Sequence, residues 1–504
     1  ISMSNARRAI LGLAGGTPAT PSGWPVGDKL DDATIPPPDA VTLLAGRTSF
    51  GARQEEIDVA RQLGYDAWLE YQLDDGAIDD DPLEPLLATS LPTLAMSNRQ
   101  LLDLANSSGR QNQAVDELRA ATFLRQIYSP RQLHEVMVEF WTNHFSVQHL
   151  DGPVRYFKTV EDRELIRRHA MGRFGDLLRG NARSPAMLWY LDNYTNIAAG
   201  PNENYARELL ELHTMGATGG YTETDVREVA RCFTGWTING LGRATGEIEF
   251  LFYGATHDYE AKAVLGNPIA AGGGVTDGDR VLDLLLAHPS TARYLASKLV
   301  RRFVSDTPPG TLVDAVAATY TQTGGDIRAM LRTLLRSAEF KASADLKFKR
   351  PVEYVMSTLR VLAPALSGGS YLRVIGTQLN TLGQLHYSWP TPDGYPDTRD
   401  YWTNTSGMVN RWNYGFELVE GTLDNGILVD VAALAGGART PFELVDRMAE
   451  RILRRPLASN DRSSLVSFVA NRQLPHRPLP EATRLARARE LAGLLLGSAY
   501  FQYR

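Results

Sequence analysis

Cysteine is almost absent from this chain of 504 residues. The single Cys232 excludes an intrachain disulfide and a zinc site built from several cysteines. No uninterrupted apolar run reaches about 18 residues, so we expect no membrane span. The net charge of −6 gives no indication of nucleic-acid binding, because proteins that bind a phosphate backbone usually carry a basic patch. We therefore expect no nucleic-acid partner.

The motifs of several common enzyme classes are missing as well. The sequence has no glycine-rich phosphate loop between a strand and a helix, no Gly-x-Ser-x-Gly elbow and no zinc-protease motif. No pair of histidines, and no Glu and His, has the spacing of a metal site on one helix. We therefore predict no cofactor, although a divalent metal held by ligands from several segments stays open.

Apolar residues recur with a helical period along most of the chain. We predict an all-α fold with a small β-hairpin insertion at 237–272, where β-prone residues lie between glycines. The expected organisation is an extended Pro/Gly-rich arm (1–40), a main helical domain (41–412) and a C-terminal helical subdomain packed on it (413–504). Residues 367–412 read as a loop-rich, aromatic segment.

The first residues of the sequence do not decide in which cellular compartment the protein is located. Arg7 and Arg8 precede a short apolar stretch, which resembles a twin-arginine export signal, but Pro18 soon interrupts it. A cytoplasmic and a periplasmic location are both compatible with this pattern.

The side chains most able to do chemistry are concentrated between Phe140 and Trp236, among aromatic residues. On a helix near 133–145, His144 shares the apolar face with Trp141, which favours a buried core histidine over a catalytic one. Trp141 itself is more typical of packing. Asn143 lies on the other, polar face of the same helix.

A second helix, near 202–213, places Glu208 and Glu211 one turn apart on one face. Repulsion between two carboxylates raises the pKa of one, which suits a general acid, and the pair could also bind a hard cation. The alternative is that Arg207 pairs with Glu203 and Glu211 across a solvated face. If the helix is regular, His213 points away from the two carboxylates.

A third helix, near 223–234, begins at a predicted capping box formed by Thr222 and Asp225. Arg231 could stack on Trp236 or hold an anion, or it could cap helix carbonyls. His257 and Asp258 follow in a predicted loop, where functional side chains are often presented.

Several longer motifs occur in a characteristic order. They are Phe-Trp-Thr-Asn-His-Phe (140–145), Ser-Pro-Ala-Met-Leu-Trp-Tyr-Leu-Asp-Asn (184–193), Tyr-Ala-Arg-Glu-Leu-Leu-Glu-Leu-His-Thr-Met-Gly (205–216), the segment 221–236 that ends in Thr-Gly-Trp, His257-Asp258 with Lys262, His-Pro-Ser-Thr-Ala (288–292) and Gly-Tyr-Pro-Asp (394–397). In these motifs the chain resembles the bacterial Domain-of-Unknown-Function family eighteen hundred over roughly residues 40–420.

The resemblance implies a family of exported proteins that often occur beside a sulfatase-like protein, so we expect such a partner. It names no reaction. It does imply a role beyond packing for the polar residues inside the motifs, which are His144, Arg207, Glu208, Glu211, His213, Asp225, Arg231, Trp236 and His257.

The leading hypothesis is a carbohydrate-active enzyme, a glycoside hydrolase or a polysaccharide lyase, with a carbohydrate substrate. Its expected catalytic residues are Glu208, Glu211, His144, Arg207 and Tyr205. Its expected substrate-binding residues are Asn143, Trp141, Asp225, Arg231, Trp236, His257, Asp258 and Trp389. The alternatives are a metal-dependent hydrolase or oxidoreductase, and a non-catalytic scaffold or binding partner of a sulfatase-like protein.

Overall fold

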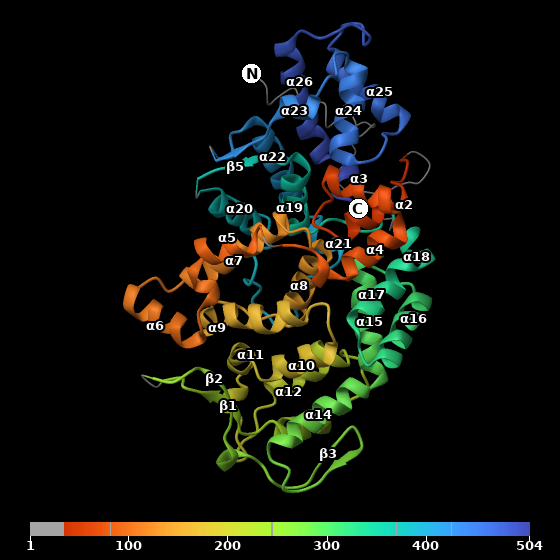
Figure 1. Ribbon diagram of the computed structural model, residues 1–504. Coiled ribbons are helices and arrows are strands. Elements are labelled where there is room, and N and C mark those ends of the chain that lie inside the picture. The colour runs from red at the N-terminus through yellow and green to blue at the C-terminus, as the bar shows by residue number, and fades with distance from the viewer. Residues whose placement is uncertain (1–34, 81, 243–244, 369, 425) are drawn as a thin grey trace.

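The computed structural model describes residues 35–80, 82–242, 245–368, 370–424 and 426–504. Over these ranges most of the chain is helical, which confirms the predicted all-α class (Figure 1). Most of the predicted arm, with Arg7 and Arg8, lies outside the described residues. No helix in the described part is long and apolar enough to cross a membrane.

The elements follow one another in three groups along the chain. The first group contains α2 (Ala40–Arg47), α3 (Gln54–Leu63), α4 (Tyr65–Leu73), η1 (Asp75–Ala77), α5 (Glu84–Ser90), η2 (Pro92–Ala95), α6 (Asn98–Ser108), α7 (Gln113–Tyr128), α8 (Gln132–His144) and α9 (Val154–Val160). The second group contains η3 (Glu161–Arg167), α10 (Phe174–Ala182), α11 (Pro185–Tyr190), η4 (Asn193–Thr195), α12 (Asn204–Glu208), η5 (Leu209–Thr214), α13 (Glu223–Cys232), α14 (Val275–Ala287), α15 (Pro289–Phe303), α16 (Gly310–Thr323), α17 (Ile327–Arg336) and α18 (Ala338–Lys341). The third group contains α19 (Pro351–Leu362), α20 (Ser370–Thr381), α21 (Arg399–Trp402), α22 (Thr405–Glu420), α23 (Val431–Ala435), α24 (Pro441–Leu453), α25 (Ser459–Ala470), α26 (Glu481–Gly497) and α27 (Ala499–Gln502).

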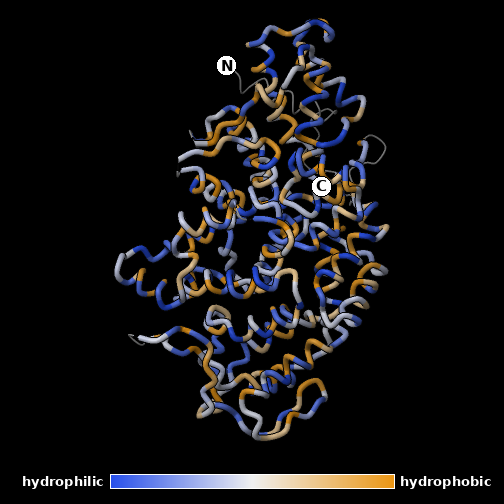
Figure 2. Tube along the Cα trace, in the orientation of Figure 1, coloured by the Kyte–Doolittle hydropathy of each residue, from blue (hydrophilic) through white to orange (hydrophobic). Residues whose placement is uncertain are grey.

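The helices form where the sequence supplies an apolar stripe and a cap. Helix α17 buries Ile327, Met330, Leu331, Leu334 and Leu335, the spacing of one helical face. Figure 2 shows the same alternation of hydrophobic and hydrophilic positions along most helices. The predicted capping box at the start of α13 is confirmed, because the Thr222 hydroxyl accepts from the backbone N–H of Asp225 at 3.2 Å.

The predicted β insertion consists of two antiparallel hairpins at one end of the molecule, next to α14 (Figure 1). Strand β1 (Trp236–Asn239) pairs with β2 (Glu249–Phe252), and Trp236 lies opposite Phe252. Strand β3 (Lys262–Val264) pairs with β4 (Asn267–Ile269). A third small pair, β5 (Ala365–Leu366) with β6 (Ile427–Leu428), joins segments that are distant in sequence.

Helix α19 lies in the middle of the molecule and is buried on almost every side. One hydrophobic core cluster surrounds it and includes residues from Leu43 to Phe501. This cluster has members on both sides of residue 412, and the division into two helical units there stays a prediction.

A network of buried charges lies at the N-terminal end of α19. The carboxylate of Glu353 accepts from Arg302 and forms a second ion pair with Arg504. Arg350 donates to Glu139 on α8 at 2.7 Å. Burial alone would raise the pKa of Glu353, but the three arginines Arg302, Arg504 and Arg350 more than offset burial and hold this pKa well below its usual range.

Glu353→Gln should therefore destabilise the protein strongly at pH 7. Removing one partner of a buried ion pair typically costs about 3–5 kcal/mol, because the other charges stay buried without compensation. A carboxylate with a depressed folded pKa stabilises the fold above its unfolded value and loses this effect as the pH falls. The difference between the variant and the wild type should consequently shrink below the ordinary pKa of 4.5.

Urea unfolding at pH 7 and at pH 4 measures both effects. Glu420→Gln, at the exposed C-terminal end of α22, is the matched control and should change the free energy of unfolding by less than about 0.5 kcal/mol. A Glu353→Gln variant as stable as this control would show that the network contributes nothing to the fold.

Candidate active site

A cavity of about 330 Å³ lies between α8 and α15, and we call it the α8–α15 cavity. Helix α8 contributes Phe140, Asn143 and His144 to its wall, and α15 contributes Tyr294, Lys298, Arg301 and Arg302. The loop 393–398 lines the remaining side, with Leu212 and Arg350. Its size is in the range of small-molecule sites, and several of its lining groups are charged.

The loop 393–398 is fixed to α8 by a two-sided contact. The Asn143 side chain donates to the backbone oxygen of Tyr395 at 2.9 Å, and its carbonyl accepts from the Tyr395 N–H at 2.7 Å. Gly394 has a φ of +76°, and a Cβ there would lie 2.2 Å from the Asn143 backbone oxygen. The predicted substrate-binding residue Asn143 therefore uses both polar groups of its amide to hold the loop 393–398 in place.

His144 and Lys298 form a hydrogen-bonded pair at the cavity wall. The Nε2 atom of His144 lies 3.1 Å from the backbone oxygen of His213, which can only accept, so Nε2 carries the hydrogen. The other ring nitrogen, Nδ1, is then free to accept from the Lys298 Nζ at 2.9 Å. Burial, with the nearby Lys298 charge, lowers the pKa of His144 well below its usual range, so the ring is neutral.

Lys298 is poised to exchange a proton near neutral pH. Burial lowers its pKa to about 8, against the opposing attraction of Asp397 and with a further lowering by Arg301. A lysine with such a pKa is deprotonated often enough to act as a base. The neighbouring Tyr294 has its pKa raised to about 12, mainly by burial, and is therefore a proton donor at neutral pH.

Arg301 supplies a positive charge without a carboxylate partner. Its Nε donates to the backbone oxygen of Asp306 at 3.4 Å. No ion pair joins it to any carboxylate in the described ranges, in contrast to the neighbouring Arg302. An unpaired guanidinium on a cavity wall favours a ligand that carries an anionic group.

Glu208 and Glu211 lie beside this cavity and do not line it. Burial, and then the negative charge of Glu211, raises the pKa of Glu208, as the sequence analysis expects for one member of the pair. Glu208 also interacts with the charge of Asp393, and Glu211 with Tyr294, both of which line the cavity. The two carboxylates are therefore close enough to interact electrostatically with residues that line the cavity.

The helix that carries these carboxylates is not regular. It runs as an α-helix through α12 and continues as a π-helix in η5, where the backbone N–H of Met215 donates to Leu210. His213 is fully buried, 6.2 Å from the His144 ring and 5.2 Å from Phe145 between ring centroids. Neither of its ring nitrogens has a hydrogen-bond partner among the described residues, and burial lowers its pKa to about 3.

Four other residues expected at the site lie elsewhere. Trp141 is buried in the core and donates to the backbone oxygen of Ala170 at 2.9 Å. Tyr205 and Trp236 are fully buried, and both pack edge to face against Phe233. Arg207 forms ion pairs with Glu223 and Glu203 at the surface, and Glu211 is not among its partners.

The residues expected to bind substrate near the β insertion form a separate network. Arg231 donates to Asp258 at 2.7 Å and to Glu228 at 2.9 Å, and it does not stack on Trp236. Asp225 accepts from Thr222 and from the backbone of Leu265. His257 is buried 3.2 Å from Asp277, which also accepts from Lys262. These contacts attach the hairpins to α13 and α14, and none of these residues lines the α8–α15 cavity.

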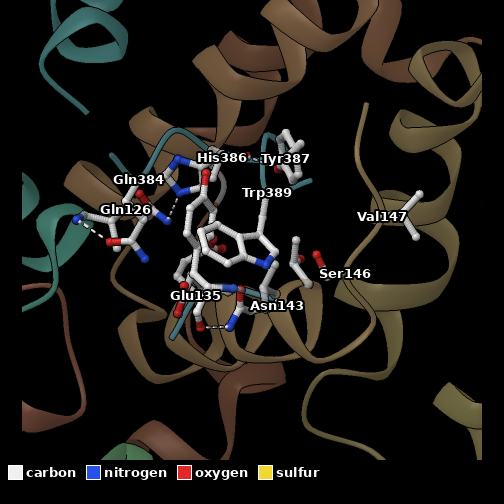
Figure 3. A pocket seen from close by; sticks show the side chains of 15 residues that line it. Gln126, Glu135, Asn143, Ser146, Val147, Gln384, His386, Tyr387 and Trp389 are labelled. Carbon is white, nitrogen blue, oxygen red and sulfur yellow. Dashed lines mark hydrogen bonds between the residues drawn. The ribbon is translucent and has the colours of Figure 1, made fainter. Parts of the chain in front are cut away.

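Trp389 lines a smaller cavity of about 40 Å³, which shares Asn143 and Tyr395 with the α8–α15 cavity. In Figure 3 its indole lies between His386 and Asn143, and Gln126 is hydrogen-bonded to His386. The indole N–H of Trp389 donates to Asp393 at 2.8 Å. Trp389 therefore orients one of the acidic residues of the α8–α15 cavity.

The described residues contain no group of three or more His, Cys, Asp and Glu side chains arranged to hold a metal ion. His144 and His257, which the metal hypothesis combines with Glu208 and Glu211, lie in two different networks. In addition, the Nδ1 atom of His144 accepts a hydrogen bond from Lys298 and is therefore not available to a metal ion.

The family described as Protein of unknown function (DUF1800) matches residues 43–503, almost the whole chain. The chain belongs to this family. The resemblance found in the sequence motifs is thereby confirmed. Comparisons with curated proteins and with solved structures gave no match. The DUF1800 description gives no activity.

Three residues of this DUF1800 chain, Tyr294, Lys298 and Arg301, were not predicted from the sequence as site residues. All three lie on one face of α15, at the spacing i, i+4 and i+7, directly after the family motif 288–292. That polar stripe is visible in the sequence. The role of these three side chains depends on α8, more than 140 positions earlier, because α8 places His144 against Lys298.

Lys298 should react with a small amine-reactive reagent at a lower pH than an ordinary lysine does. With a pKa of about 8, its labelled fraction should rise with a midpoint near pH 8. The pKa of an unperturbed lysine is about 10.4. Pulse labelling with acetic anhydride across pH 6–11, read by peptide mass spectrometry, measures the midpoint. Lys341, exposed on α18, is the internal comparison, and a shared midpoint for both residues would contradict the assignment.

Proposed function

We propose that this chain is a polysaccharide lyase that acts on uronate-containing chains. The observation that carries the proposal is the proximity of three complementary groups on α15. They are a lysine with a pKa of about 8, a protonated tyrosine and an arginine without a carboxylate partner in the described part of the chain. These groups match the three needs of an elimination next to a carboxylate.

In this mechanism Arg301 binds the uronate carboxylate and neutralises its charge, which makes the proton on the adjacent carbon more acidic. Neutral Lys298 removes that proton, and the electron pair forms a carbon–carbon double bond. The glycosidic C–O bond breaks at the same time, and Tyr294 donates its proton to the leaving oxygen. The products are an unsaturated uronate end and a new reducing end.

His144 is a positioning residue in this scheme. Its Nδ1 accepts one hydrogen from Lys298, so the lysine lone pair is directed elsewhere when the amine is neutral. The Asn143–Tyr395 contact holds the opposite wall in place. Trp389, with the tyrosines Tyr395 and Tyr401 packed against it, supplies an aromatic surface for sugar rings next to the cavity.

Purified protein should release products that absorb near 235 nm from uronate polysaccharides, and the rate should rise with pH through about 8 as Lys298 loses its proton. Lys298→Ala should lower kcat about 10²–10⁴-fold, the usual contribution of an acid–base group. Arg301→Gln should raise KM for the anionic substrate. Lys341→Ala is the control and should leave both constants unchanged.

A glycoside hydrolase is the second candidate, because the raised pKa of Glu208 beside Glu211 is typical of a general acid. Reducing ends without ultraviolet absorbance, lost in Glu208→Gln and kept in Lys298→Ala, would favour the hydrolase. If neither product forms from neutral or uronate polysaccharides, both assignments fail.

A further inference from the structure

A groove of about 920 Å³ lies between α3 and α24, and we call it the α3–α24 groove. It shares no lining residue with the α8–α15 cavity. Figure 1 shows α24 and α25 at one end of the molecule, whereas α8 and α15 lie nearer its middle. Its wall is formed by α3, the loop 437–439, α24, the loop 454–457 and the start of α25.

The groove is rich in positive charge, in a chain whose net charge is −6. The described residues that line it include six arginines, Arg61, Arg439, Arg447, Arg454, Arg455 and Arg462, and three carboxylates, Glu443, Asp446 and Glu450. A positive concave surface on an acidic protein concentrates anions locally.

Three of the six arginines form ion pairs of 2.9 Å or shorter within the protein. Arg455 pairs with Asp345 through two contacts of 2.6 and 2.8 Å. Arg462 makes two contacts of 2.6 Å with Asp446, and Arg61 contacts Asp39 at 2.9 Å. The pairs of Arg455 and Arg61 attach the walls of the groove to the rest of the fold, and the pair of Arg462 with Asp446 joins α25 to α24.

The guanidinium groups of the other three arginines are available to a ligand. Arg439 is exposed, and neither it nor Arg454 forms an ion pair with a carboxylate in the described ranges. Arg447 approaches Glu450 only at 3.4 Å, and both side chains are substantially exposed. Exposed pairs of this kind contribute little, so Arg447 can exchange its partner for a ligand.

Arg454 is held in an unusual way. It follows α24 in the left-handed region, with φ +60° and ψ 22°, where glycine is the usual residue. One end of its guanidinium donates to the Gln54 side chain, and its buried Nε has no partner among the described residues. Burial, with repulsion from Arg451, lowers its pKa to about 10. A residue kept in an unfavourable conformation, with an unsatisfied donor, indicates a role other than stability.

We propose that the α3–α24 groove binds a ligand carrying two or more oxyanion groups, phosphate or sulfate, through Arg439, Arg447 and Arg454. The planar guanidinium matches the tetrahedral oxyanion with paired N–H donors. Three such side chains around one groove of this volume suit a ligand with several anionic groups. Apolar residues at its base, including Ile57 and Leu457, can contact the uncharged part of such a ligand.

Binding is measured by titration calorimetry at constant ionic strength, with inorganic phosphate, pyrophosphate and a disulfated disaccharide as probes. Pyrophosphate or the disaccharide should bind saturably and at least tenfold more tightly than phosphate, and the tighter of the two identifies the source of the oxyanions. Arg439→Gln and Arg454→Asn should each weaken binding at least tenfold. Arg293→Gln, which removes an exposed arginine of α15, is the control and should leave binding unchanged.

The variant Arg454→Asn separates binding from folding, because asparagine tolerates the left-handed conformation. Its melting temperature should equal or exceed that of the wild type while its affinity falls. Weak, unsaturable binding that is equal in all variants would overturn the proposal. So would an Arg454→Asn variant that melts several degrees lower while Arg439→Gln binds normally, since Arg454 would then be structural only.

Discussion

The buried ionic network at the start of α19 is the constraint on which the rest of this structure depends. Glu353 and Glu139 are surrounded by arginines from α15, from the N-cap of α19 and from residue 504. Charges removed from water are tolerated only if each finds a partner in a defined geometry. The network therefore fixes α8 and α15 relative to each other, and through Arg350 and Lys347 it also holds Asp397. Since these same elements form the α8–α15 cavity, its shape follows from this pairing.

The protonation states of the polar groups in the cavity depend on this packing, because it excludes water. His144 is neutral and Lys298 has a lowered pKa for the same reason, which is that both lie between packed helices and beside other positive groups. Arg302 and Arg350 are neutralised by the network, whereas the adjacent Arg301 has no carboxylate partner among the described residues. One turn of α15 thus carries a structural cation and a cation available to a ligand. The second basic surface, between α3 and α24, shows the same division between paired and available arginines.

Local features were predictable from the sequence, and long-range contacts were not. The helical period, the Thr222–Asp225 cap and the β insertion depend on neighbouring residues, so their patterns are visible in the chain. The grouping of Glu208 with Glu211 follows from their spacing, whereas the raised pKa of Glu208 depends first on burial, which only the tertiary fold sets. The π-helical turn at Leu209–Thr214 was missed because the helical wheel assumes regular geometry. The ion pairs of Arg231 and Arg207 depend on partners that only the tertiary fold selects.

The contact between Arg47 and the backbone oxygen of Arg504 has a consequence for how the molecule folds. These residues are 457 positions apart, and the Arg504 side chain also completes the pairing of Glu353. During synthesis the central helix emerges before its last counter-charge exists. Until residue 504 is made, Glu353 lacks one cation and Arg47 lacks one acceptor. Loop closure over such a separation is slow, so we expect the core to be completed late in folding. We therefore expect this chain to fold more slowly than one whose helices pack in order of synthesis.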